Sequence, residues 1–287
     1  MEIKDLTGLS EPLKKLVETI SNGIGVLYEP RRIRKKADAD AYRLETEAIA
    51  EAKRIQIEGE AKINILERAK QRLVFQELQR QENIEEIAEK AIEFLDEGNT
   101  SNEPVDENWI TKFFNHAQDI KSDKARVIWA KILAREVESP GSISLRCIDN
   151  LRNISAKEAK IFTKLCKLIT NKSEIYYPND VANHQKILGI SFEQIGLLKD
   201  AGLIKPSHLR FFSFGFGDDA KEFNFGGNRY TVSTRKKIGL GMIKYHELTN
   251  VGIEICSLMT TVQDSRYIEE MINYINEENV IMKMGDE

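Results

Sequence analysis

The sequence predicts a mainly α protein with a long N-terminal coiled-coil-like helix, a helical subdomain, and a C-terminal winged-helix-like α+β module. Two observations lead to this prediction. Small or apolar residues recur every eleven positions from Ile33 to Val74, which is the spacing of a nearly straight helical stripe. After Ser155 the period changes, and alternating apolar residues surround a Gly-Gly-Asn turn, which is typical of a β-hairpin.

Residues 1–30 form an amphipathic N-terminal segment. Apolar residues from Leu9 to Leu27 follow three- and four-residue spacings, which predicts a short helix. Gly23 and Gly25 weaken its second half, where we expect a bend or a break. Pro30 suits the first turn of a new helix, because its missing N–H falls among the donors that a helix start leaves unpaired.

Residues 31–95 contain no proline and one glycine, Gly59, which predicts a helical stalk of about 65 residues and about 95 Å. The residues between the apolar positions are mostly charged or Gln, so a lone helix would leave its stripe in water. We therefore predict that copies of the stalk pack side by side, while a helix folded back near Gly59 stays an open alternative. The predicted oligomerisation stripe is Ile33, Ala37, Ala41, Leu44, Ala48, Ala52, Ile55, Gly59, Ile63, Leu66 and Val74.

A basic run directly follows the amphipathic segment. Cations at a helix N-terminus oppose the helix dipole, which indicates an anionic partner. The interpretations are burial of the apolar segment against neighbouring subunits, which we favour, attachment to a membrane surface, and contact with nucleic acid. The residues concerned are Leu13, Leu16, Val17, Ile20, Ile24, Leu27, Arg31, Arg32, Arg34, Lys35 and Lys36.

The remaining chain divides into three parts. Residues 96–106, rich in Gly, Asn, Ser and Pro, predict a linker. Residues 107–154 predict a helical subdomain with an aromatic-rich core, built from helices at about 107–120, 123–137 and 142–151. Residues 155–287 predict the winged-helix-like domain with a C-terminal helix, opened by a Ser-x-x-Glu capping box at Ser155 and Glu158.

A DNA-binding interpretation of the last domain has little support. Its candidate recognition helix, Ser191–Leu203, has a net charge of −1 and few groups for phosphate contact. The basic residues lie in the hairpin and at its exit instead, and we expect the domain to bind another protein. These basic residues are Arg229, Arg235, Lys236 and Lys237.

Composition and motifs indicate no chemistry. The chain has 287 residues, a net charge of −4, and three cysteines without a CxxC pair, which fits a reducing cytoplasm. No apolar run approaches the roughly 20 residues that span a bilayer, and no signal peptide is evident. The four histidines lack metal-ligand spacing, and the Gly215–Asp219 loop is more typical of a turn than of a cation site. We predict a non-enzymatic protein without cofactor or metal, cytoplasmic or peripheral at the inner membrane.

Four segments carry a resemblance to a known group of proteins. They are Ile20–Ala37 (ISNGIGVLYEPRRIRKKA), Ile128–Val137 (IWAKILAREV, followed by SPGS), Leu198–Ile204 (LKDAGLI) and Glu247–Gly252 (ELTNVG). Together they resemble bacterial families of unknown function related to the Abi-alpha (abortive infection) proteins. The stalk is also similar in composition to the helices of stomatin- and prohibitin-like cage proteins.

The resemblance implies a role in bacterial defence against phage, exerted through protein assembly and without an active site. We predict a homo-oligomeric scaffold or sensor that assembles through its long helix and binds a partner protein through its C-terminal domains. A membrane-surface abortive-infection effector, anchored by the N-terminal segment, is the first alternative. A winged-helix DNA-binding regulator is the second.

Overall fold

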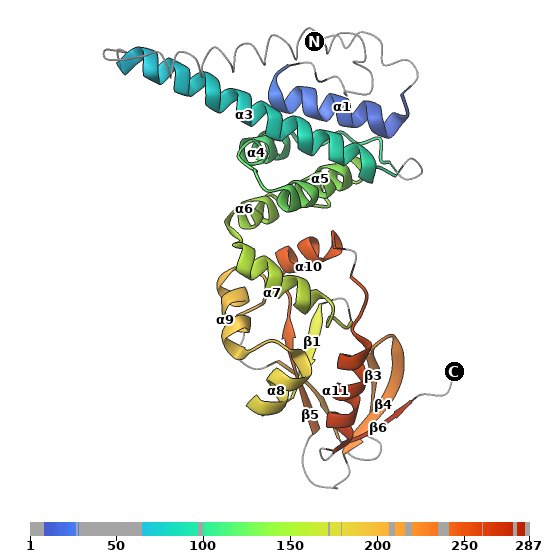
Figure 1. Ribbon diagram of the computed structural model, residues 1–287. Coiled ribbons are helices and arrows are strands. Elements are labelled where there is room, and N and C mark those ends of the chain that lie inside the picture. The colour runs from blue at the N-terminus through green and yellow to red at the C-terminus, as the bar shows by residue number, and fades with distance from the viewer. Residues whose placement is uncertain are drawn as a thin grey trace. The chain divides into compact units, whose positions relative to one another are not determined.

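The computed structural model describes residues 9–26, 28, 65–96, 100–171, 173–178, 180–206, 210–215, 220–234, 241–259, 261–277 and 280–284. The chain forms two compact units, an N-terminal unit of residues 1–148 and a C-terminal unit of residues 149–287 (Figure 1). The described part is mainly helical with two small antiparallel sheets, so the fold class is α+β. Within these ranges, no helix has both the length and the apolar character needed to cross a membrane.

The described part of the N-terminal unit is helical. Its most extensive contacts join α3 to α5, and α1 packs on α4 and α5. The helices are α1 (Glu11–Ile24), α3 (Ile65–Phe94), α4 (Glu107–Ala117), α5 (Asp123–Glu138) and the first residues of α6 (Leu145–Asn153). α3 is the C-terminal part of the predicted stalk helix, and residues 31–64 lie outside the described ranges. A long coiled-coil helix over 31–95 therefore stays a prediction.

Aromatic residues of α4 and α5 form the predicted core of this unit. The rings of Trp109 and Phe113 stack with centroids 5.0 Å apart, and Trp129 lies 5.2 Å from Phe113. The Trp109 indole N–H donates to the Ile143 carbonyl over 2.8 Å, which ties the segment after α5 to α4. All three rings are buried, so they supply much of the apolar burial that holds the unit together.

A hydrogen-bond network fixes the C-terminal half of α3 to the α4–α5 turn. The Arg126 guanidinium donates to the Asn83 side chain over 2.6 Å and pairs with Glu86, both on α3. The Asn83 amide donates in turn to the Gln118 carbonyl over 2.7 Å. Because each of these groups has a partner, burial of Asn83 carries little cost.

A buried carboxylate organises the turn after α5. Glu136 is 1% exposed, and its two oxygens accept from the backbone N–H groups of Gly141 and Ile143 over 2.6 and 2.9 Å. The residue therefore acts as the hydrogen-bond acceptor for the Pro140–Ser142 turn, where φ at Gly141 is +82°. Buried charges of this kind are stable only when fully hydrogen-bonded.

We expect Glu136→Gln to lower the free energy of unfolding of the N-terminal unit by about 2 kcal/mol, because the amide NH₂ would face a backbone donor. Both tryptophans of the chain, Trp109 and Trp129, lie in this unit, so denaturant unfolding followed by tryptophan fluorescence measures it selectively. Glu93→Gln, at an exposed position of α3, is the matched control. Equal stability of the two variants would contradict the role given to Glu136.

The C-terminal unit combines two three-stranded sheets with helices. The strand orders are β1-β5-β2 and β3-β4-β6, with all pairs antiparallel. The strands are β1 (Glu174–Tyr177), β2 (Phe211–Phe214), β3 (Lys221–Phe225), β4 (Asn228–Thr234), β5 (Gly241–Glu247) and β6 (Val280–Met284). The helices are α7 (Ala156–Cys166), α8 (Val181–Leu188), α9 (Phe192–Asp200), α10 (Asn250–Ser257) and α11 (Ser265–Glu277), and α11 lies beside β6 (Figure 1).

Tyr176 of β1 joins the two sheets. Its ring contacts Phe223 of β3 at 4.9 Å between centroids and Tyr245 of β5 at 5.4 Å. The Tyr267 hydroxyl of α11 donates to the Tyr176 carbonyl over 2.9 Å. An aromatic layer thus holds the hairpin β3–β4 and α11 to the first sheet.

Local signals in this unit predict the structure well. The capping box at Ser155 and Glu158 is confirmed, with both reciprocal hydrogen bonds present. The hairpin is confirmed too: Gly226 and Gly227, with φ of +58° and +82°, form a two-residue loop between β3 and β4. α8, β2 and β6 were not predicted, and the apolar tail at residues 280–284 is the strand β6.

Candidate functional site

The apolar face of the N-terminal segment is buried inside its own unit. Leu16, Val17 and Ile20 of α1 are 0–1% exposed, and α1 packs against α4 and α5. Leu13 and Ile24 are half-buried. The helix continues through Gly23 and ends at Ile24, where Gly25 adopts a left-handed conformation with φ of +73°, so the expected break lies at Gly25. Leu27 and the basic residues Arg31, Arg32, Arg34, Lys35 and Lys36 lie outside the described residues.

Gly23 allows α1 to approach α4 closely. A Cβ atom at Gly23 would lie 2.1 Å from the Phe114 ring and 2.7 Å from Ile110, so only glycine fits. Nearby, the Lys15 ammonium donates to the Ser101 carbonyl over 2.7 Å, and burial lowers the pKa of Lys15. α1 is therefore seated on the unit by close packing and by a hydrogen bond to the segment before α4.

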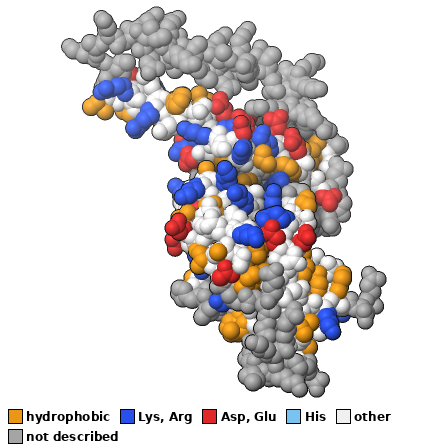
Figure 2. All heavy atoms as spheres, turned by 60° about the horizontal axis from the view of Figure 1, so that its bottom comes forward, with side chains coloured by type: hydrophobic (Ala, Val, Ile, Leu, Met, Phe, Trp, Pro, Cys, Tyr) orange, Lys and Arg blue, Asp and Glu red, His pale blue; other side chains and the backbone are white. Residues whose placement is uncertain are grey.

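The predicted oligomerisation stripe reaches the described structure at its last two positions. Leu66 and Val74 are 73% and 52% exposed on the N-terminal half of α3. Ile65, Leu73 and Phe75 are exposed by 58–75% on the same stretch. We call these five residues the α3 apolar surface, and Figure 2 shows hydrophobic side chains uncovered at that end of α3. The other stripe residues, Ile33, Ala37, Ala41, Leu44, Ala48, Ala52, Ile55, Gly59 and Ile63, lie outside the described ranges.

The two halves of α3 have different surroundings. From Asn83 onward the helix buries Ile84, Ile87, Ala88 and Ala91 within its unit. Before Gln71, every described residue of α3 is exposed. Isolated apolar residues on a surface are ordinary, whereas Leu66, Leu73 and Val74 lie within about 100° of one another around the helix axis, and grouped apolar residues of this kind mark an interaction site.

The predicted recognition helix is poorly suited to bind phosphate. α9 exposes Glu193 and Asp200, and Lys199 is half-buried. Of the basic hairpin residues, Arg229 is described and lies 4.0 Å from Glu222, while Arg235, Lys236 and Lys237 lie outside the described residues.

The sequence analysis did not predict a basic face on α7. The lysine spacing of i, i+3, i+7 and i+10 was the pattern that could have revealed it. It consists of the exposed residues Lys157, Lys160, Lys164 and Lys167.

Two histidines that are far apart in the sequence meet in the core of the C-terminal unit. The Nε2 atoms of His184 and His246 are 3.5 Å apart. His184 stacks on Phe192 with ring centroids 3.8 Å apart, and His246 stacks on Tyr177 at 4.2 Å. Burial lowers the pKa of His184 to about 4 and that of His246 to about 3, so both rings are neutral at pH 7.

The described residues contain no group of three or more metal-ligating side chains. Cys166 and Cys256 form a hydrogen-bonded thiol pair, and this contact together with burial raises the pKa of Cys166. All three cysteines are free thiols. Both histidine rings lie against aromatic neighbours and Cys166 is buried, which is the arrangement of a packed core.

The fold and this surface thus define the class of the protein: it is an α+β protein with an exposed apolar helix surface. The chain belongs to a family described as protein of unknown function (DUF2806), whose model matches residues 67–272. The match runs from the start of α3 into α11 and leaves out α1. No curated protein and no solved structure matches the chain.

Proposed function

We propose that this protein is a non-enzymatic homo-oligomeric scaffold or sensor that assembles through its long helix and binds a partner protein through its C-terminal unit. The observation that supports assembly is the α3 apolar surface. Leu66 and Val74, the last members of the eleven-residue stripe, are exposed on the N-terminal half of α3.

The exposed side chains favour association energetically. Fully burying an exposed Leu or Val side chain contributes about 1.5–3 kcal/mol, so partial burial of Leu66, Leu73 and Val74, which share one side of α3, contributes a few kcal/mol in each copy. Association costs about 4–15 kcal/mol in lost freedom, so this surface alone gives a weak contact. The stripe continues from Val74 back to Ile33 with the same spacing, and its additional positions would enlarge the interface.

A second copy of the chain is the occupant that we propose for this surface. The same helix of each copy would then form one side of the contact. A period near 3.67 residues keeps the stripe on one face of a nearly straight helix, so the stripes of two copies can face each other along their length. Small residues such as Ala48, Ala52 and Gly59 would permit close approach of the helix axes.

The assembly proposal is tested by the solution mass of the full chain. We expect Leu66→Lys, Leu73→Lys and Val74→Lys together to shift the mass measured by light scattering toward that of a monomer. The control, Glu67→Gln, Gln71→Lys and Gln76→Lys, adds the same positive charge to other positions of α3 and should leave the mass unchanged. A wild-type monomer, or an oligomer unaffected by the apolar substitutions, would contradict the proposal.

A role in anti-phage defence in the bacterial cytoplasm is the biological setting that we propose. It rests on the resemblance of Ile20–Ala37 and Ile128–Val137 to the Abi-alpha-related families. The expected result is a lower efficiency of plaquing in cells that carry the gene than in cells that carry the variant with a substituted α3 apolar surface. Equal plaquing across a broad phage panel would count against this setting.

The two alternatives make separate predictions. A membrane-surface effector would depend on Arg31, Arg32 and Arg34, and flotation with anionic liposomes would be lost when these become Glu.

A winged-helix DNA-binding regulator finds support in the basic face of α7 and in the helix–strand–helix–helix order of α7, β1, α8 and α9. The DNA-binding alternative requires an affinity for duplex DNA that falls as the salt concentration rises.

A further inference from the structure

Two cysteines that are far apart in the sequence meet in the C-terminal unit. Cys166 is the last residue of α7 and Cys256 lies near the end of α10, and Figure 1 shows these two helices next to each other. A hydrogen bond joins the two thiols, and both are free. Because a disulfide requires its two side chains to approach closely, this contact is the geometry from which one forms.

The backbone beside the pair holds the two helix ends together. Directly after Cys166, the Lys167 carbonyl accepts from the Asp264 N–H over 2.9 Å. The Gln263 side chain donates to the Ile169 carbonyl over 3.0 Å. The segment that follows α10 is therefore bonded to the segment that follows α7, so the contact between the thiols belongs to the fold and does not depend on two free side chains meeting by chance.

The N-terminal end of α10 is held by a different contact. Thr249 caps the helix, and its backbone N–H donates to the Leu203 carbonyl over 3.0 Å. A Cβ atom at Gly252 would lie 2.3 Å from the same carbonyl oxygen, so α10 approaches the segment after α9 closely at this end. A covalent bond at Cys256 would therefore secure the opposite end of the helix.

The two thiols have different surroundings, which gives them different roles. Cys166 is 5% exposed, whereas Cys256 is half-buried and accessible to a small molecule. The hydrogen bond from Cys166 lowers the pKa of Cys256, while the same bond and burial raise the pKa of Cys166. Because the thiolate is the reactive form of cysteine, Cys256 is the thiol that an oxidant meets first.

We propose that Cys256 is a site of modification by hydrogen peroxide and that it then forms a reversible disulfide with Cys166. The Cys256 thiolate attacks one peroxide oxygen, so a sulfur–oxygen bond forms and the oxygen–oxygen bond breaks. The leaving hydroxide takes a proton and becomes water. The sulfur is oxidised to a sulfenic acid by the two electrons that the peroxide gains.

Cys166 completes the reaction. Its thiol gives up a proton and attacks the sulfenic sulfur of Cys256, so the sulfur–sulfur bond forms and the sulfur–oxygen bond breaks. The departing hydroxide takes this proton and becomes a second water. One peroxide and two thiols thus give one disulfide, which joins α7 to the C-terminal end of α10. The inference goes beyond the proposed function and is independent of the assembly through α3.

The test treats the full chain with hydrogen peroxide and measures its mass. We expect the wild type to lose two hydrogen atoms, and peptide mapping without reductant to place the new bond between Cys166 and Cys256. Cys147 is completely buried and should keep its thiol, so it serves as the internal reference. Dithiothreitol should restore the original mass. Hydrogen exchange at residues 254–257 should slow by about tenfold after oxidation, because the bond restricts opening of α10.

Two variants separate the roles of the thiols. Cys166→Ala should stop the reaction at the sulfenic acid, which dimedone traps on Cys256. Cys256→Ala should make oxidation of Cys166 about tenfold slower than in the wild type, since the remaining thiol is buried. Ser257→Ala, a change at the adjacent and exposed position of α10, is the matched control and should form the disulfide normally.

The inference is overturned if the wild type keeps its two hydrogen atoms, if the bond includes Cys147 or joins two chains, or if Cys166 is oxidised equally fast without Cys256. The mass and peptide readouts on the wild type require no substitution, so they hold even where a variant folds poorly. Light scattering reads the assembly through α3 separately, and failure of either proposal leaves the other standing.

Discussion

Leu16→Ala is expected to lower the free energy of unfolding of the N-terminal unit by about 3 kcal/mol. Leu16 is completely buried between α1 and the helices beneath it, and the tight contact of Gly23 with Phe114 leaves α1 little room to move into the vacated space. The cost therefore combines lost burial with a cavity that the unit fills poorly.

Tryptophan fluorescence during urea unfolding measures this effect, because both tryptophans lie in the N-terminal unit. Val26→Ala is the matched control: it truncates an apolar side chain that is 52% exposed just beyond α1, and we expect a change below about 0.5 kcal/mol. A loss below about 1 kcal/mol for Leu16→Ala would mean that α1 detaches readily from the unit.

The outcome bears directly on the membrane alternative. For α1 to place its apolar face in lipid, Leu16, Val17 and Ile20 would have to leave the core of the unit together. Each of these side chains contributes about 1.5–3 kcal/mol of burial, which insertion at the membrane surface would have to offset. Under the membrane alternative, the intact protein would therefore meet an anionic surface through its basic run and not through the buried face of α1.

The comparison of α1 with its sequence pattern shows what amphipathicity can and cannot predict. The three- and four-residue spacing correctly marks Leu16, Val17 and Ile20 as a buried face. The same pattern is satisfied equally by a neighbouring subunit, a lipid surface or the same unit, so the partner of that face could not be read from it. Only the long-range contacts with α4 and α5 settle it.

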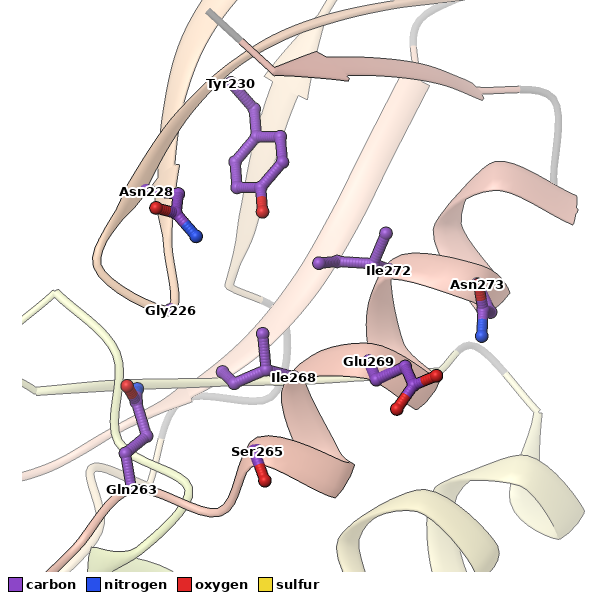
Figure 3. Close-up of a pocket in the computed structure, with 9 residues that line it drawn as sticks. All are labelled: Gly226, Asn228, Tyr230, Gln263, Ser265, Ile268, Glu269, Ile272 and Asn273. Carbon is purple, nitrogen blue, oxygen red and sulfur yellow. The ribbon is translucent and has the colours of Figure 1, made fainter. Parts of the chain in front are cut away.

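Signals confined to a few neighbouring residues were readable, because the chemistry lies within one turn. Ser155 and Glu158 satisfy each other's backbone N–H groups, and Gly226 with Gly227 supplies the positive φ angles of a tight hairpin. β6 was missed because its pairing with β4 joins residues about 50 positions apart. The pocket between the hairpin and α11, which Tyr230 and Glu269 both line (Figure 3), was missed for the same reason, since it forms only after α11 packs beside the hairpin.

Acidification from pH 7 to pH 5 is expected to lower the free energy of unfolding of the C-terminal unit by about 4 kcal/mol. The unfolded chain takes up protons at the ordinary histidine pKa of about 6.5, whereas folded His184 and His246 have pKa values of about 4 and about 3. Between these values the unfolded state binds more protons, so stability is constant above about pH 6.5 and falls as the pH drops. Each histidine contributes about 1.4 kcal/mol per pH unit over this window.

The surroundings of the two histidines support a loss of stability on acidification. Each ring is buried against an aromatic neighbour, and the positive charge of Lys199 further disfavours protonation of His246. A proton on either ring would also repel a proton on the other across the 3.5 Å between their Nε2 atoms. Amide hydrogen exchange of β5, corrected for the intrinsic pH dependence of exchange, gives the opening free energy of this unit at each pH.

The double substitution His184→Phe and His246→Phe keeps aromatic rings in the core and removes both titrating groups. Its opening free energy should stay nearly constant between pH 7 and pH 5, whatever its value at pH 7. His116→Gln, in the N-terminal unit, is the control that should retain the full pH dependence of β5. If the double variant loses stability on acidification as steeply as the wild type, the pH sensitivity arises from other groups and the buried pair is not its cause.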